Sequence, residues 1–345
     1  MISITAKREF SVIGMGEVML RLSPPAKERI SYCEQFEKRA GGSELNVVSG
    51  ISALGLRTGI ITKLPKNEIG KFVKHKIRYS GTSDDFLTYD GSSDARLGIY
   101  YYESGAYPRQ SVVSYDRGHS SFCGFRESEL PGRIYESASV FHTSGITLAL
   151  GDEIREQTVT VMKKFKERGA LISFDVNYRQ SLWSEGDALR AISEILPLVE
   201  VLFVSEETLR RMFSMAGSLE NIQKALSEKY KNLEIILSTR RKAISPVKHS
   251  FSSLVYDARD DLHFCGTEYK GIEVVDRIGS GDAYVAGALY GALSGFSGQK
   301  IAEYGGAMAA LKSTVPGDMA QCDATDIERI IKNNSPTEPK SEMVR

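Results

Sequence analysis

Short apolar runs alternate with amphipathic stretches along most of this chain, and no other feature limits its fold as strongly. The apolar runs have the length of β-strands and lie at residues 11–16, 59–64, 138–145, 171–177, 200–205 and 234–239. The stretches between them have helical periodicity and cover Glu44–Leu54, Ile69–Ser80, Asp152–Arg168, Gly186–Leu196, Leu219–Tyr230 and Ala283–Ser294. Strands separated by helices of this length predict an α/β fold, in which helices cover both faces of a mostly parallel sheet.

Two segments break this rhythm. Residues 18–40 mix aromatic and charged side chains, and residues 95–118 alternate aromatic with polar side chains around a Gly-Ala-Tyr-Pro turn. Such alternation is typical of antiparallel strands that expose one face, so we expect a small sheet beside the main body that acts as a lid. Residues 1–333 are expected to form one domain. Residues 334–345 are polar and contain proline, so we expect a flexible tail there.

Composition excludes several classes of protein. The 44 Lys and Arg residues equal the 44 Asp and Glu residues, whereas a nucleic-acid binder that relies on phosphate contacts has a large basic excess. No apolar run reaches the roughly 18 residues of a membrane span, and the N-terminus lacks the apolar core of a signal peptide. Neither disulfides nor a metal site are predicted from five scattered histidines and four widely spaced cysteines, Cys33, Cys123, Cys265 and Cys322. We expect a soluble cytoplasmic protein without a nucleic-acid or membrane partner.

The segment VVDRIGSGDAYVAGALYGALSG (274–295) carries the clearest chemical signal. We interpret its first residues as an apolar strand that ends at Asp276, after which a Gly-Ser-Gly-Asp turn (279–282) leads into a helix rich in Ala and Gly. Glycines at such a turn let the backbone approach a ligand, and the first N–H groups of a helix attract an anion. A carboxylate beside an anion is unfavourable unless it takes a proton from an attacking hydroxyl, so Asp282 is a candidate general base.

The alternative interpretation is that Asp282 only caps the helix and the glycines only form a tight turn. Because the glycines, the acid and an apolar helix coincide late in an α/β chain, we favour chemistry. The small side chains of the helix also predict that it packs closely against the sheet. Other motifs are excluded, because Met19 stands where a dinucleotide fingerprint beginning at Gly14 needs its third glycine, and GxxxxGK[ST], GxSxG and HExxH are absent.

The DRIGSGDAYVAG segment resembles the C-terminal signature of the ribokinase-like (PfkB-type) sugar kinases, and GGSELNVVSGISALG (41–55) resembles their other signature. The similarity extends over roughly residues 10–330, and FDVNYRQSLW together with DRIGSGD is most similar to the 2-keto-3-deoxygluconate kinases of that family. The resemblance implies a ribokinase-like three-layer α/β/α sandwich with a small β-sheet lid. It also implies transfer of the γ-phosphoryl group of ATP to a primary hydroxyl of a sugar acid, with Mg²⁺ and a monovalent cation such as K⁺ as cofactors.

The resemblance assigns the phosphoryl transfer to the Gly-Ser-Gly-Asp turn. Asp282 would take the proton of the sugar hydroxyl. The backbone N–H groups that would bind the transferring phosphoryl group belong to Gly279, Ser280 and Gly281.

The residues implied for sugar binding are Gly41, Gly42, Asn46, Tyr100, Tyr115, Arg117, Arg179 and Asp318. A sugar acid needs a cation for its carboxylate, which the two arginines would supply. The two tyrosines are interpreted equally well as packing within the lid, and Asp318 alone would be an ordinary turn residue. The glycine pair also fits a turn before a helix that Ser43 caps, and a cap is compatible with sugar binding.

The nucleotide side departs from the family pattern. The residues implied there are Asn177, Ser205, Thr239 and Arg240. Ser205 and Thr208 occupy the Asn and Glu positions of the family's N-x-x-E motif, and the adjacent Glu206 and Glu207 are interpreted as a solvated first turn of a helix. STRRKAIS (238–245) replaces a Gly-rich stretch, and its arginines, Arg240 and Arg241, either contact nucleotide phosphates or are solvated.

Two other functions remain open from the sequence. One is a kinase for another sugar such as fructose, which is favoured if Arg117 and Arg179 face solvent. The other is a catalytically impaired sugar-binding regulatory protein, which the altered nucleotide motifs suggest and Asp282 opposes. The resemblance also implies a homodimer formed through the lid sheets.

Overall fold

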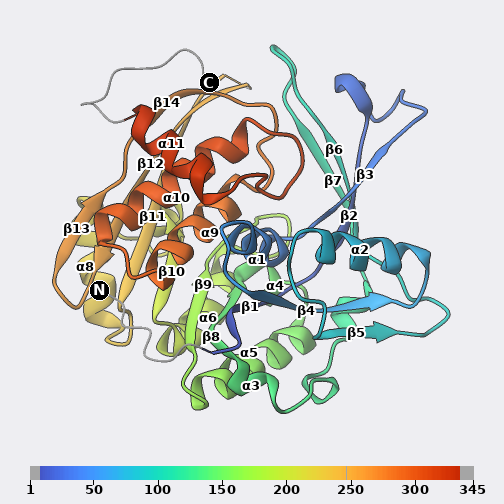
Figure 1. Cartoon of the computed structure of the whole chain (residues 1–345), viewed down its shortest axis with the longest axis horizontal. Helices are drawn as coiled ribbons and strands as arrows, with labels where there is room; N and C mark the ends of the chain where they lie inside the picture. Colours follow the sequence, from blue (N-terminus) through green and yellow to red (C-terminus); the bar gives the residue numbers. More distant parts are fainter. Residues whose placement is uncertain (1–7, 246, 335–345) are drawn as a thin grey trace.

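The computed structural model describes residues 8–245 and 247–334 (Figure 1). The expected tail therefore lies outside the described residues from residue 335 onward, while Asn334 is the last residue of a helix. Within the described ranges, no helix is long and apolar enough to cross a membrane.

The larger of two sheets has ten strands. Its parallel part runs in the order β11-β10-β9-β8-β1-β4-β5. The bounds of these strands are Phe10–Met15 (β1), Thr58–Pro65 (β4), Leu87–Asp90 (β5), Ala138–Ser144 (β8), Leu171–Asp175 (β9), Val201–Ser205 (β10) and Ile235–Ser245 (β11). All six expected strands are present, because apolar runs of this length are buried by helices on both faces.

Three antiparallel strands complete this sheet, and the sequence analysis missed them. They are β12 (Lys248–Asp257), β13 (Leu262–Cys265) and β14 (Tyr269–Glu273), with β11 and β12 paired along most of their length. The prediction of an apolar strand that ends at Asp276 is wrong, because β14 ends at Glu273 and the residues that follow form a loop. The backbone N–H groups of Val275 and Asp276 bond to the carbonyl of Ser313 instead of to a neighbouring strand.

Helices cover both faces of the sheet, each over its own apolar core. One face carries α1 (Ser43–Ala53), α2 (Glu68–Tyr79), α9 (Ser280–Leu293), α10 (Gly298–Ser313) and α11 (Ala324–Asn334). The other face carries α3 (Ile134–Ser137), α4 (Gly145–Leu148), α5 (Asp152–Glu167), α6 (Glu185–Ile195), α7 (Glu206–Arg211) and α8 (Leu219–Lys229). Short 3₁₀ turns lie at Pro25–Lys27, Ser121–Gly124, Glu127–Glu129 and Leu196–Leu198. The predicted α/β/α layering is confirmed.

The smaller sheet has four strands in the order β3-β2-β6-β7 and stands beside the main body at the upper right of Figure 1. Its strands are β2 (Met19–Ser23), β3 (Glu37–Gly41), β6 (Ile99–Glu103) and β7 (Val112–Asp116). Both expected segments therefore contribute to it. The sheet is mixed, however, because β2 and β6 come from separate segments and pair in parallel.

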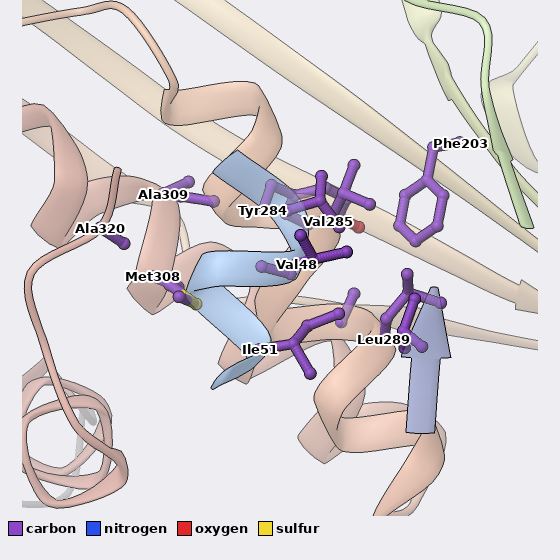
Figure 2. Packing of buried hydrophobic residues seen from close by; sticks show 14 of the residues in the cluster. Val48, Ile51, Phe203, Tyr284, Val285, Leu289, Met308, Ala309 and Ala320 are labelled. Carbon is purple, nitrogen blue, oxygen red and sulfur yellow. The ribbon is translucent and has the colours of Figure 1, made fainter. Parts of the chain in front are cut away.

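Small residues of α9 let other helices approach it. A Cβ at Gly287 would lie 2.6 Å from the carbonyl oxygen of Tyr304 on α10, and a Cβ at Gly50 on α1 would lie 2.8 Å from the Cβ of Ala286. Figure 2 shows Val48 and Ile51 of α1 beside Val285 and Met308. The prediction that this small-residue face meets the sheet is wrong: it meets α1 and α10, since only Gly and Ala allow backbones so close.

Candidate active site

A cavity of about 1020 Å³ opens where the parallel strands end at their carboxyl termini. It lies between this edge, the start of α9 and the smaller sheet, as expected for an open parallel sheet. The residues assigned to the site from the sequence that line it are Gly42, Asn46, Tyr100, Tyr115, Arg117, Asn177, Arg179, Ser205, Thr239, Arg240, Gly279, Ser280, Gly281, Asp282 and Asp318. It is also lined by Ser43, Glu206, Glu207, Thr208 and Arg241, which the sequence analysis discussed as well. Gly41 lies just behind the lining.

Asp282 is the third residue of α9, and the helix is capped by Gly279. Gly279 has a left-handed φ of 81°, and a Cβ there would lie 1.9 Å from the carbonyl oxygen of Asp318. Glycine is therefore required at this turn. The interpretation of Asp282 as a helix cap is wrong, because α9 has no side-chain cap and the Asp282 carboxylate accepts its hydrogen bonds from α1 instead.

Two donors from α1 hold the Asp282 carboxylate. The Ser43 hydroxyl donates to Oδ1 at 2.8 Å, and the Asn46 amide donates to Oδ2 at 2.7 Å. Burial raises the pKa of Asp282, while these hydrogen bonds and the charge of Arg179 oppose the rise. A buried carboxylate with a raised pKa is suited to accept a proton near neutral pH.

Ser43 links Asp282 to the loop after β9. Its hydroxyl oxygen accepts a hydrogen bond of 2.9 Å from the Asn177 amide while it donates to Asp282. The prediction that Ser43 caps α1 is wrong, because Gly42 is the N-cap and makes no side-chain cap. The hydroxyl cannot satisfy the backbone because it serves the carboxylate 239 residues away in sequence.

The first turn of α9 has N–H groups free for a ligand. Ser280 N–H makes a long bond of 3.4 Å to the Arg277 carbonyl, and those of Gly281 and Asp282 have no acceptor within the described part of the chain. A Cβ at Gly281 would meet nothing within 4 Å, so there is open space beside this residue. Free N–H groups at a helix N-terminus bind anions, and the dipole of the helix adds to the attraction.

A buried ionic network joins the smaller sheet to the loops around α9, and the sequence analysis missed its centre. Arg21 on β2 pairs with Asp276 at 2.6 Å and with Asp318 at 2.5 Å, and it is buried. Burial alone would lower the pKa of Arg21, but the two carboxylates raise it. Tyr100 on β6 donates to Asp318, so Asp318 is more than a turn residue.

Gly41 leaves room for this network. A Cβ there would lie 2.2 Å from Oδ2 of Asp318 and 2.7 Å from the hydroxyl oxygen of Tyr100. The fully buried Lys312, which the sequence analysis also missed, donates from Nζ to the carbonyl oxygens of Asp276 at 3.0 Å and Val315 at 3.4 Å. Its ammonium therefore holds the two loops that flank the start of α9.

The cations predicted for the site differ in their partners. Arg117 forms an ion pair with the buried Glu17, with Nε 3.0 Å from Oε2. Arg240 pairs with Glu206 and is largely exposed. Arg179 donates only to the carbonyl of Tyr178 at 3.4 Å, and no carboxylate among the described residues pairs with it. Arg179 is thus available to an anion in the cavity.

The other residues predicted for the site line the cavity and contact neighbouring residues of their own or adjacent elements. Tyr115 lies against Tyr100 with ring centroids 5.9 Å apart, so packing within the smaller sheet accounts for part of its position. Ser205 caps α7 by accepting a bond of 3.1 Å from Thr208 N–H. Thr239 lies on the neighbouring parallel strand β11, where it pairs in register with Ser205 of β10.

No group of three or more His, Cys, Asp or Glu that could hold a metal occurs in residues 8–245 and 247–334. Mg²⁺ in nucleotide sites is commonly held by one or two carboxylates together with phosphate groups and water. Carboxylates that line the cavity, among them those of Asp175, Glu207 and Asp282, fit a cation that arrives with a nucleotide. The open, N–H-lined start of α9 fits the phosphate groups themselves.

Comparison with known proteins identifies the family. A model of the pfkB family of carbohydrate kinases matches residues 10–325. This chain belongs to that family. Its membership implies ATP and a divalent cation.

Individual relatives agree with this membership. A 2-dehydro-3-deoxygalactonokinase from Haloferax volcanii is 34% identical over 325 residues, covering 93% of this chain and 96% of the relative. A 2-dehydro-3-deoxygluconokinase from Bacillus subtilis is 27% identical over 82% of this chain and 83% of its own length. The crystal structure of a 2-dehydro-3-deoxygluconokinase from Thermotoga maritima has a TM-score of 0.89 at 33% identity, covering 94% of this chain and 98% of that one. The ribokinase-like fold is confirmed.

Proposed function

We propose that this kinase transfers the γ-phosphoryl group of ATP to the primary hydroxyl of 2-keto-3-deoxygluconate, giving 2-keto-3-deoxy-6-phosphogluconate. The observation that carries the proposal is the buried Asp282, held by Ser43 and Asn46 at the edge of a cavity with free N–H groups. A protein that only binds sugars has no use for a base beside an anion site. The names of the Bacillus and Thermotoga relatives support the substrate.

In the proposed reaction, Asp282 accepts the proton of the sugar hydroxyl as the hydroxyl oxygen attacks the γ-phosphorus of ATP. The bond between the γ-phosphorus and the oxygen that bridges it to the β-phosphate breaks, and ADP leaves. Ser43 and Asn46 orient the carboxylate and keep it ionised before the reaction. The N–H groups at Gly279, Ser280 and Gly281 stabilise the charge on the transferring phosphoryl group. The donor of the phosphoryl group would be ATP in complex with Mg²⁺. Of the residues predicted on the nucleotide side, Ser205, Thr239 and Arg240 line the same cavity near β10 and β11.

Arg179 supports an acidic substrate, because its guanidinium lines the cavity without a carboxylate partner among the described residues. A planar guanidinium binds a carboxylate through two parallel hydrogen bonds. Arg117 also lines the cavity, but Glu17 already balances its charge. We therefore propose that Arg179 binds the substrate carboxylate and that Arg117 contributes to the shape of the sugar site.

The galactose-derived epimer, 2-keto-3-deoxygalactonate, is the second candidate substrate, because the Haloferax relative carries that activity in its name. An assay of ADP release with Mg–ATP distinguishes the candidates, using both epimers, fructose, ribose and gluconate. Turnover confined to the deoxy keto-acids supports the proposal. Turnover on fructose alone would remove the carboxylate assignment, and sugar binding without turnover would favour a regulatory protein.

The matched variant is Asp282→Asn, which keeps the shape of the side chain and removes the base. We expect turnover to fall by about 10²–10⁴-fold, the usual contribution of general-base catalysis, with sugar binding largely retained. Unchanged turnover would contradict the mechanism.

We also propose a homodimer formed through the smaller sheet, whose segments expose Tyr32, Phe36, Tyr107, Val112 and Tyr115. Sedimentation of the wild type and of Val112→Glu tests this, and a monomeric wild type would contradict it. The monovalent cation stays a prediction from the family resemblance, tested by replacing K⁺ with tetramethylammonium in the assay. A cytoplasmic location is supported by the four free cysteines.

A further inference from the structure

Seven arginines within the described ranges line the cavity, and their pairing divides them into two groups. Four have carboxylate partners: Arg117 with Glu17, Arg210 and Arg240 with Glu206, and Arg211 with Glu185 and Glu207. The other three form no ion pair with any carboxylate in residues 8–245 and 247–334, and they are Arg179, Arg241 and Arg277.

The three unpaired arginines act on one another. The pKa of Arg241 is lowered by partial burial and by the positive charges of Arg277 and Arg179. His249, on the neighbouring strand β12, adds no negative charge; burial and the charges of Arg241 and Arg277 lower its pKa. No described carboxylate forms an ion pair with Arg241 or Arg277, although Glu207 acts on Arg241 from a distance. This part of the cavity therefore carries unpaired positive charge that attracts an anion.

The positions of Arg241 and Arg277 point to the start of α9. Arg241 follows Thr239 at the alternate position on β11 and is in register with Phe251, and both of these residues line the cavity. Arg277 precedes Gly279 by two residues in the loop that leads into α9. Arg277 therefore lies beside the turn that carries the free N–H groups, and Arg241 lies near enough to Arg277 to act on it electrostatically.

We propose that Arg241 and Arg277 bind the β- and γ-phosphate groups of the phosphoryl donor, an inference that rests on the proposed kinase function. A sugar acid brings one negative charge, for which Arg179 is sufficient. A triphosphate brings several, and guanidinium groups bind phosphate through paired hydrogen bonds. The two arginines would serve the phosphate groups in place of the altered motifs, in which Thr208 stands at the acid position and STRRKAIS replaces a glycine-rich stretch.

Inorganic tripolyphosphate tests the site without sugar or turnover. Calorimetric titration of the full chain should detect binding, which Arg241→Gln and Arg277→Gln should each weaken by about 10-fold or more. The control is Lys242→Gln, because Lys242 is exposed, is the next residue on β11 and does not line the cavity. Equal affinity in all four proteins, or no binding by the wild type, would overturn the proposal.

Kinetics and stability separate this role from others. With ATP varied, both variants should raise KM for ATP by about 10-fold or more and leave KM for the sugar acid unchanged. A rise in KM for the sugar acid alone would assign the arginines to the substrate and overturn the proposal. At low salt and without anion, both variants should be at least as stable as wild type, since repulsion is relieved; a lower Tm would indicate a structural role instead. If no sugar were a substrate but both variants still weakened tripolyphosphate binding, only the proposed function would be refuted.

Discussion

The hydroxyl of Ser43 offers a direct test of how α1 controls the proposed base. It donates to Oδ1 of Asp282 at 2.8 Å, and Asn46 donates separately to Oδ2. Both bonds favour the ionised carboxylate, against the burial that raises its pKa. Ser43→Ala removes one of them and leaves the carboxylate and the fold of α1 in place, because the hydroxyl makes no helix cap.

The expected size follows from the energy of the bond. A hydrogen bond to a charged group contributes about 1.5–3 kcal/mol, and about 1.4 kcal/mol corresponds to one pH unit. A base works in its ionised form, so kcat/KM rises with pH through its pKa. Losing a donor to the ionised form moves this acidic limb to higher pH, by about 1–2 pH units. At pH values above the limb, the variant should recover most of the wild-type rate.

The assay is kcat/KM for ADP release measured from pH 5 to pH 9. Ser49→Ala is the matched control, since Ser49 is also buried on α1 but donates to the Asn46 carbonyl and not to Asp282. Its acidic limb should coincide with that of the wild type. An unmoved limb in Ser43→Ala, or an equal loss of rate at every pH, would refute the assignment of the limb to Asp282.

Three further predictions concern stability, each measured by urea unfolding. Gly279→Ala places a Cβ at a left-handed φ of 81° and 1.9 Å from the carbonyl oxygen of Asp318, so it should lower the free energy of unfolding by about 2 kcal/mol or more. The control Gly281→Ala adds a Cβ with nothing within 4 Å and should not destabilise the fold. Equal stabilities of the two variants would contradict this. Lys312→Met leaves two buried carbonyl groups without their shared donor and should cost about 2–4 kcal/mol, and a neutral result would show that the ammonium is dispensable. Burial and the charge of Asp282 raise the pKa of Asp175 to about 7. The contribution of this group to the free energy of unfolding is therefore present below about pH 4 and is lost as pH rises toward 7. Between pH 5 and pH 8, Asp175→Asn should be more stable than the wild type by about 1–2 kcal/mol, less than the full shift because the residue is partly accessible; the same pH dependence of stability in both proteins would contradict the raised pKa.

The parallel core could be predicted because its signal is local. Strands such as β8, buried at every position, require consecutive apolar residues, and those runs are visible in the sequence. β12 to β14 lack such runs, since polar residues such as Ser250 and Ser253 are buried within β12. The Gly-Ser-Gly-Asp turn was equally visible, because its glycines, base and helix are adjacent in sequence.

The contacts that make the site work are not local, and this is why they were missed. Arg21 reaches Asp318 across 297 residues, and Ser43 reaches Asp282 across 239. A serine after two glycines has the pattern of a cap whether or not a distant carboxylate takes its hydroxyl.

Contacts between residues distant in sequence also determine which arginines of the cavity are free to bind a ligand. Arg240 and Arg241 are neighbours in sequence and equal in chemistry, yet Glu206 on α7 neutralises only the first. Whether a guanidinium can accept a ligand depends on which carboxylates the fold brings to it. Residue type and position in a motif do not determine this, so the predicted contact of Arg240 with phosphate requires that Glu206 release it, whereas Arg241 and Arg277 need no such release. Glu206→Gln frees both Arg240 and Arg210, which Glu206 pairs. If the variant raised the affinity for tripolyphosphate and the added Arg240→Gln change removed that gain, Arg240 would join the site; if affinity stayed unchanged, the site would consist of the unpaired arginines.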